Sequence, residues 1–185
     1  CKEHIVFSPP NVRVEGGDVL LNNEYIFIGY SEDIDFQKHI VSRTNKNAIS
    51  FIQKLFPNKN VVGFELNKSD TDPRKNALHL DCCFQPIGHD KAILYKEGFK
   101  HKKDIKFLVN YFGEENIIEI DTEEMYNMNS NVFSISEKII VSDKSFTRLN
   151  LRLKELGFVV EEISYMETSK MEGLFRCSTM PLIRE

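Results

Sequence analysis

Cys177 is the residue of this sequence best suited to nucleophilic chemistry. It lies in the segment 176–181, which reads RCSTMP, directly after Arg176 and among short polar residues. A neighbouring cation lowers the pKa of a thiol and favours the thiolate, which is the form that attacks carbon. The segment therefore indicates a nucleophilic cysteine, and a buried, unreactive thiol is the alternative that it leaves open.

A histidine and an aspartate stand two residues apart in the segment 79–81, which reads HLD. The apolar run over 78–85 predicts a strand, on which His79 and Asp81 share one face while Leu80 points to the other. An imidazole and a carboxylate on one face can serve as an acid/base group and a substrate anchor. A structural histidine with a hydrogen-bonded partner is the alternative.

Two further groups of polar residues precede predicted elements. Glu15 and Asp18 enclose two glycines, which allow a ligand to approach the backbone closely, so the carboxylates could hold a cation or orient a histidine. Arg43, in the segment 42–45 that reads SRTN, could bind a carboxylate through its planar guanidinium group. The alternatives are a solvated turn for the acidic pair and an exposed helix start for Arg43.

One hydrophobic pattern occurs three times along the chain and predicts strand, strand, helix, strand. In each copy two short apolar runs flank a turn, a helical apolar stripe follows, and a third apolar run ends the copy. We predict units over about 12–66, 77–121 and 128–164. The expected strands cover 19–21, 25–29, 61–65, 78–85, 92–95, 117–120, 132–135, 139–141 and 159–163.

Capping residues predict where the helices begin and end. Thr44 begins the helix of the first copy, and Ser142 or Asp143 begins that of the third, because their side-chain oxygens can accept from free backbone N–H groups. Gly113 and Gly157 end the second and third helices, because glycine adopts the left-handed conformation readily.

The segment after the third copy, residues 172–185, is apolar and β-prone but has no helix of its own. A lone terminal strand must pair with another unit to satisfy its backbone hydrogen bonds. The sequence therefore predicts an α+β fold in which the repeated units form a ring that a C-terminal strand closes.

The composition indicates one globular domain and excludes several classes of protein. The chain has 185 residues, 41% apolar and 28% charged, with a net charge of 24 − 28 = −4. This charge gives no electrostatic footprint for nucleic acid. No apolar run approaches the ~20 residues of a membrane helix, and residues 1–10 lack the pattern of a signal peptide. The four cysteines match neither a disulfide framework nor paired zinc ligands, so we expect a cytoplasmic protein with reduced thiols.

In combination and in this order, the motifs EGGD (15–18), SRTN (42–45), HLD (79–81) and RCSTMP (176–181) resemble those of the guanidino-group-modifying enzyme superfamily, the penteins. That superfamily contains arginine deiminases, dimethylarginine dimethylaminohydrolases and arginine:glycine amidinotransferases. The resemblance spans residues 12–185 and implies an α/β propeller of five units around a central site. This chain contains about three of the five units and the closing strand.

The resemblance implies catalytic roles for three residues. Cys177 corresponds to the nucleophile, His79 to the general acid/base, and Glu15 to the carboxylate that orients the histidine. No metal and no organic cofactor is required, because covalent attachment and proton transfer supply the chemistry.

The resemblance also implies a set of substrate-binding residues. Asp81 corresponds to the carboxylate that binds the guanidinium nitrogens, and Asp18 is also assigned to substrate binding. Arg43 corresponds to the arginine that binds the substrate α-carboxylate. Asn131, in the segment 129–131, matches a stretch that lies near the substrate in relatives.

These roles predict a hydrolase that acts on the guanidino group of L-arginine or a close derivative through a covalent amidino intermediate on Cys177. The alternatives are an amidinotransferase, a non-catalytic binding fragment of a propeller, and a fold in which Cys177 and His79 share no site. The expected partner is a small guanidino compound, without nucleic acid or membrane. A homo-oligomer and association with the N-terminal units that the chain lacks both stay open.

Overall fold

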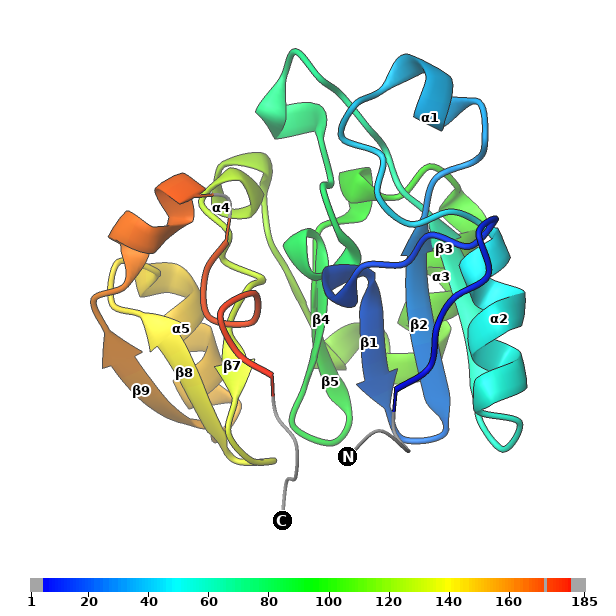
Figure 1. The fold of residues 1–185 in the computed structure, drawn as a ribbon. Helices are drawn as coiled ribbons and strands as arrows, with labels where there is room; N and C mark the ends of the chain where they lie inside the picture. Colours follow the sequence, from blue (N-terminus) through cyan, green and yellow to red (C-terminus); the bar gives the residue numbers. More distant parts are fainter. Residues whose placement is uncertain (1–4, 172, 181–185) are drawn as a thin grey trace.

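The computed structural model describes residues 5–171 and 173–180. It contains three three-stranded sheets, each with a helix of nine or more residues between its second and third strands (Figure 1). In every sheet the strands lie in chain order, with the first pair antiparallel and the second pair parallel. The predicted unit of strand, strand, helix and strand is therefore confirmed in all three copies.

Apart from the start of β4, the bounds of the repeated strands lie within two residues of the predicted ones. The first unit comprises β1 (Val19–Asn22), β2 (Tyr25–Tyr30), α2 (Asn47–Leu55) and β3 (Asn60–Glu65). The second comprises β4 (Phe84–Ile87), β5 (Lys91–Leu94), α3 (Lys102–Phe112) and β6 (Ile117–Glu119). The third comprises β7 (Phe133–Ser134), β8 (Ile139–Asp143), α5 (Thr147–Glu155) and β9 (Val159–Ile163). Two short helices, α1 (Asp35–Lys38) and α4 (Thr122–Tyr126), lie in connections.

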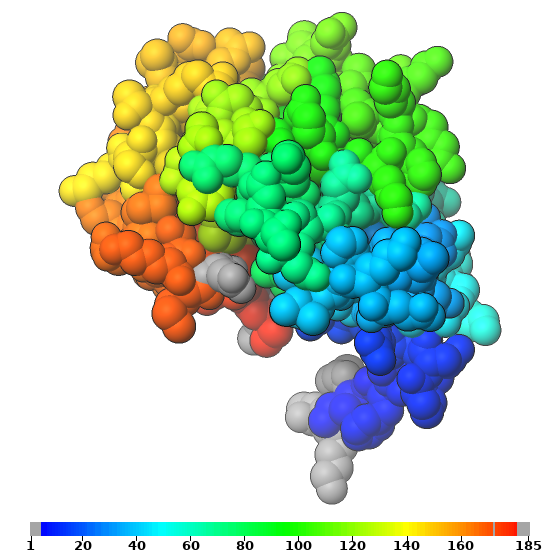
Figure 2. Space-filling model, turned by 90° about the horizontal axis from the view of Figure 1, so that it is seen from above, coloured from blue at the N-terminus to red at the C-terminus, as the bar shows by residue number. Residues whose placement is uncertain are grey.

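The three units follow one another around an arc. Viewed from above, the colours pass from blue through green to yellow and orange, and the red C-terminal segment lies between the first and third units (Figure 2). The side chains of β4 are buried at all four positions, whereas those of β9 are mostly exposed. The second unit is therefore covered on both sides, as its central place in the arc requires.

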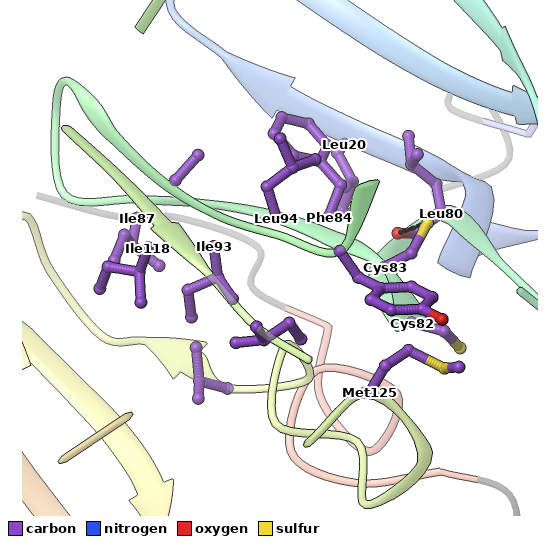
Figure 3. Close-up of a cluster of buried hydrophobic side chains, with 14 of the residues drawn as sticks. Leu20, Leu80, Cys82, Cys83, Phe84, Ile87, Ile93, Leu94, Ile118 and Met125 are labelled. Carbon is purple, nitrogen blue, oxygen red and sulfur yellow. Dashed lines mark hydrogen bonds between the residues drawn. The ribbon is translucent and has the colours of Figure 1, made fainter. Parts of the chain in front are cut away.

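A continuous apolar core joins the units. Phe27, Phe64 and Phe84 are fully buried, and their ring centroids lie 5.5 to 6.5 Å apart. Figure 3 shows the part of this core where Leu20 of the first unit meets Phe84 and Leu94 of the second. Truncating a buried Phe to Ala typically costs about 3 to 5 kcal/mol, so these rings hold the units together. Among the described residues, no helix has the length and apolarity needed to cross a bilayer.

The prediction of a strand over 78–85 is wrong for its first half. Residues Leu80–Cys82 form a 3-10 turn, and β4 begins only at Phe84. The backbone makes turn hydrogen bonds here, from Cys82 N to His79 O at 3.2 Å and from Cys83 N to Leu80 O at 3.0 Å. Strand alternation therefore does not relate His79 to Asp81, and the argument for a shared face is wrong.

The prediction of a closing C-terminal strand is also wrong for residues 173–180. This segment forms a turn, in which Ser178 N donates to Leu174 O at 3.0 Å and Thr179 N donates to Arg176 O at 3.3 Å. Residues 172 and 181–185 lie outside the described part of the chain. The described residues form an arc of three separate sheets and not a closed ring.

Two helix starts differ from the prediction, whereas the glycine ends agree with it. α2 begins at Asn47 and not at Thr44, whose hydroxyl instead accepts from Glu15 N at 3.1 Å. Ser142 and Asp143 end β8, and α5 begins at Thr147. Gly113 follows α3 directly with a φ of 84°, and Gly157 follows α5 after one further residue with a φ of 88°. These positive φ values favour glycine at both helix ends.

Candidate functional site

The imidazole of His79 is held between a carboxylate and the backbone of a glycine. Its Nε2 lies 2.7 Å from Glu15 Oε2, so the ring donates to a carboxylate that fixes its orientation. A Cβ atom at Gly17 would lie 2.8 Å from Cγ of the ring. Glycine is thus needed at this position because the backbone of the turn Gly16–Asp18 supports the ring directly.

Asp18 lies beneath this pair and is 1% exposed. Its Oδ1 accepts from Leu80 N at 2.9 Å, and the Thr44 hydroxyl donates to the same carboxylate. Burial raises the pKa of Asp18, and the charges of His79 and Lys68 oppose that rise. Through these contacts Asp18 supports the segment that carries His79, and the substrate contact assigned to Asp18 stays a prediction.

Asp81 is fully buried in the turn that precedes β4. Ser130 Oγ donates to the backbone oxygen of Asp81 at 2.9 Å and joins the second unit to the third. Burial raises the pKa of Asp81 to about 6, while the charges of His79 and Arg176 oppose the rise. Near neutral pH the carboxylate is therefore mostly ionised, and a cationic ligand would stabilise it further.

The turn that carries Cys177 is attached to Asn131, which is fully buried ahead of β7. Asn131 Oδ1 accepts from Leu174 N and Cys177 N, both at 3.2 Å, and its Nδ2 donates to Cys177 Sγ at 3.1 Å. The Arg176 N–H donates to the Asn131 backbone oxygen at 3.3 Å. Both ends of the Asn131 amide thus hydrogen-bond to the turn that carries Cys177, and the substrate contact expected of Asn131 stays a prediction.

The thiol of Cys177 lies against Asp81. Its Sγ is 3.6 Å from Asp81 Oδ2, and the residue is exposed on its other side. Burial and the Asp81 charge raise the pKa of the thiol from an ordinary 9.0 to about 11, although the Asn131 hydrogen bond opposes the rise. The expectation that Arg176 makes this cysteine a thiolate in the free protein is therefore wrong. The Arg176 side chain instead donates to Val19 O at 3.4 Å.

Arg43 lies beside the His79–Glu15 pair. Its Nε is 3.8 Å from Glu15 Oε1, and its Nη1 donates to Ile40 O at 2.8 Å. The side chain is 35% exposed, so part of the guanidinium group is open to a ligand. The structure therefore places Arg43 at the edge of the same site, held by the connection that contains α1.

The predicted residues meet because they occupy equivalent places in the three units. Asp18, Asp81 and Asn131 each lie within three residues of the start of the first strand of a unit, and the turn with Cys177 contacts the last two of them. The charge of His79 acts on Asp81, which also contacts the thiol. The thiol thus lies against Asp81, and the imidazole lies against Glu15.

Three supporting residues were missed from the sequence: Thr44, Lys68 and Ser130. Each hydrogen-bonds to a segment that carries a site residue. Thr44 and Lys68 lie in polar stretches of the sequence, which do not indicate which side chains make tertiary contacts. Thr44 does belong to the SRTN motif. Among the described residues, no group of three or more histidine, cysteine, aspartate or glutamate side chains is arranged to hold a metal ion.

Comparison with known proteins gives relatives over nearly the whole chain. The uncharacterized protein YkgA of Bacillus subtilis strain 168 is 30% identical over 174 residues, which are 94% of this chain and 54% of that protein. The arginine deiminase of Mycoplasma capricolum is 29% identical over 206 residues, which are 93% of this chain and 47% of the relative. The chain thus spans about half the length of these curated relatives.

Solved structures show a similar fold. The N-terminal domain of ArgZ, a cyanobacterial arginine dihydrolase, in a mutant form bound to substrate, aligns with a TM-score of 0.78 at 23% identity and covers 96% of this chain and 59% of that one. DDAH from Pseudomonas aeruginosa, in a mutant form complexed with citrulline, aligns with a TM-score of 0.69 at 20% identity, and the alignment covers 91% of this chain and 56% of that one.

The family is shown by a sequence model that covers almost every residue. The model described as N,N dimethylarginine dimethylhydrolase, eukaryotic, matches residues 4–184. Together with the deiminase relatives and the similar folds, this match shows that the chain belongs to the N,N dimethylarginine dimethylhydrolase family of the guanidino-group-modifying (pentein) superfamily.

Proposed function

We propose that this protein hydrolyses the guanidino group of L-arginine or a close derivative through a covalent intermediate on Cys177. The observation that carries the proposal is the contact of the Cys177 thiol with the buried Asp81 carboxylate, 3.6 Å apart, beside the His79–Glu15 pair. A buried anion next to a partly exposed thiol suits a cationic, electrophilic substrate. The deiminase and dihydrolase activities named for its relatives support this choice.

Binding of the substrate cation prepares the nucleophile. In the free protein the Asp81 charge and burial hold the pKa of Cys177 at about 11, so the thiol is protonated near neutral pH. A guanidinium group bound to Asp81 neutralises that charge and adds a positive charge beside the sulfur, and both effects lower the pKa of the thiol. The thiolate then forms where its electrophile is already bound.

The covalent step forms a carbon–sulfur bond and breaks a carbon–nitrogen bond. His79 takes the proton of the Cys177 thiol, and the thiolate attacks the central guanidinium carbon to give a tetrahedral adduct. His79, oriented by Glu15, gives a proton to the departing nitrogen, which leaves as ammonia or an amine. His79 then takes a proton from water, the hydroxide adds to the amidino carbon, and the thiolate departs to leave a ureido product.

Arg43 supports the choice of an amino acid as substrate. Its guanidinium group lies at the edge of the site and is only partly paired, with Glu15 at 3.8 Å. An α-carboxylate can replace the Ile40 oxygen as its hydrogen-bond partner. We therefore propose that Arg43 binds the α-carboxylate and distinguishes arginine from guanidino compounds that lack one.

We also propose that further polypeptide completes the site, either as two more units of a closed propeller or as another copy of the chain. Large apolar side chains are exposed on the units at the two ends of the arc, at Leu21 (66%) in the first and Ile135 (47%) and Val159 (53%) in the third. Exposed apolar side chains of this size are suited to packing against another surface.

Product analysis tests the function. Incubation with L-arginine is expected to give citrulline and ammonia, and Cys177→Ser is expected to lose that activity while keeping its fold, as judged by circular dichroism. A new guanidino compound formed only when an amine acceptor is added would show an amidinotransferase instead. Binding of arginine without any product would favour a non-catalytic binding protein.

A further inference from the structure

Lys68 is a charged residue inside the polar connection between the first and second units. Its Nζ donates to the backbone oxygens of Ala77 at 2.7 Å and Leu78 at 2.8 Å. These are the two residues directly before His79. The ammonium group is therefore attached to the segment that enters the site.

Asp18 holds the same segment from the other side. Its carboxylate accepts from Leu80 N at 2.9 Å, and Leu80 is the residue directly after His79. The charges of Lys68 and Asp18 act on each other, and the Asp18 charge opposes the fall that burial causes in the pKa of Lys68. Other charged or titratable groups that face Lys68 are Arg43, Cys82 and Cys83.

A buried ammonium group is costly unless an opposite charge and hydrogen-bond acceptors surround it. Asp18 supplies the charge, and Ala77 and Leu78 supply the acceptors. The half-buried Lys68 and the buried Asp18 thereby satisfy backbone polar groups on both sides of His79. If either Lys68 or Asp18 is removed, the charge of the other loses its opposite charge. The backbone at residues 77–80, which both side chains hydrogen-bond, is then expected to be less stable.

We propose that Lys68 is a positioning residue, and that Lys68 and Asp18 together form a clamp on the backbone before and after His79. The clamp holds the imidazole against Gly17 and in reach of Glu15. This proposal rests on the proposed acid/base role of His79. A residue that acts in this way affects the chemical step more than substrate binding, because Lys68 contacts the protein and not the substrate.

Lys68→Met tests the clamp, because methionine keeps a similar length but has neither charge nor donors. Backbone amides of residues 78–83 are expected to exchange with deuterium at least about tenfold faster than in the parent protein. The kcat for arginine hydrolysis is expected to fall about 10- to 100-fold while KM changes less than about threefold. The matched control is Lys75→Met, which removes an exposed lysine from the same connection and is expected to change neither.

Asp18→Asn is the second variant. It keeps an oxygen for Leu80 N but removes the charge that faces Lys68, so the same amides are expected to exchange faster. Parent-like exchange over 78–83 in both variants would overturn the clamp, and so would a loss confined to KM. Deuterium exchange needs no turnover, so it is also measured with both substitutions in the Cys177→Ser background. A failure of the proposed reaction would leave the exchange result unchanged, whereas a failure of the clamp would not.

Discussion

Replacing Asp81 by asparagine is expected to make Cys177 more reactive toward a neutral reagent while it abolishes turnover. The side chain keeps its size but loses the charge that lies 3.6 Å from the sulfur. A thiolate next to a neutral amide is easier to form than one next to a carboxylate. The guanidinium substrate, in contrast, loses the anion that binds it.

The size of the effect follows from the contact distance and the thiol pKa. Two full charges 3.6 Å apart repel by about 4.6 kcal/mol at an effective dielectric constant of about 20, and by about 1.2 kcal/mol in bulk water. The rise in the pKa of Cys177 from 9.0 to about 11 corresponds to about 2.7 kcal/mol in total, and burial causes the larger part. Because water screens the exposed sulfur, we assign about one pKa unit to Asp81, or about a tenfold change in thiolate concentration.

Alkylation by iodoacetamide measures this change, because the reagent is uncharged and reacts with the thiolate. The rate at Cys177 is read from its peptide by mass spectrometry between pH 6 and 10, and the buried Cys83, whose thiol contacts Leu80 O, serves as an internal control. Asp81→Asn is expected to react about tenfold faster at pH 7.5. The matched control is Asp90→Asn, at an exposed aspartate paired with Lys91, and is expected to react like the parent. An unchanged or slower rate in a folded Asp81→Asn protein would refute the reasoning.

Four further predictions concern the same site. Since the pKa of Asp81 is about 6, KM for arginine is expected to rise as the pH falls through about 6 and the carboxylate becomes neutral, as initial rates from pH 5 to 8 will show. The pKa of Asp81 is raised from the ordinary 3.8 by folding, so the ionised carboxylate destabilises the folded state above about pH 6. Asp81→Asn removes this charge and is expected to raise the free energy of unfolding at pH 7.5 by up to about 3 kcal/mol. Urea titrations should show this gain vanishing near pH 4, where Asp81 is protonated in the folded state. Asn131→Asp keeps the oxygen that accepts from Cys177 N but places a charge beside the sulfur, so alkylation of Cys177 at pH 7.5 is expected to slow at least about tenfold, and an unchanged rate would contradict the N–H to sulfur contact. Gly17→Ala puts a Cβ within 2.8 Å of the His79 ring, so kcat is expected to fall about tenfold or more in a protein that still folds, and parent-like turnover would place the ring elsewhere.

The repeated unit could be predicted from the sequence because its signals are local. Paired apolar runs, a turn and a helical stripe each depend on residues close together in the chain. All three sheets and their helices follow the predicted order. Gly113 likewise ended its helix as predicted, with a φ of 84°. Local patterns are therefore sufficient for the fold class and for the order of its elements.

The turns at the site could not be predicted, because tertiary contacts determine them. Residues 78–83 are apolar enough for a strand, but Asp18, some sixty residues earlier, accepts from Leu80 N and Lys68 holds the backbone of Leu78. The turn of residues 173–180 depends in the same way on Asn131, 46 residues before Cys177. Short-range propensity gives no indication of partners at such separations.

The pairing of two sets of candidate residues could be predicted, whereas the environment of the thiol could not. The order of the four motifs singled out Cys177, His79, Glu15 and Asp81, and the structure brings Cys177 against Asp81 and His79 against Glu15. The neighbouring Arg176 suggested a thiolate, but its side chain contacts Val19 O while the nearest charge to the sulfur comes from the second unit. A residue next to Cys177 in the sequence therefore need not supply the charge that lies nearest to its sulfur in the folded chain.

The formation of a bond between Cys177 and the substrate carbon is the central claim, and acid quenching followed by mass spectrometry tests it most directly. Protein mixed with excess L-arginine is quenched within the first turnovers, and the peptide that contains Cys177 is weighed. We predict a peptide heavier by arginine less one ammonia, absent from Cys177→Ser protein. Arginine turnover without this adduct, and undiminished in Cys177→Ser protein, would contradict the account.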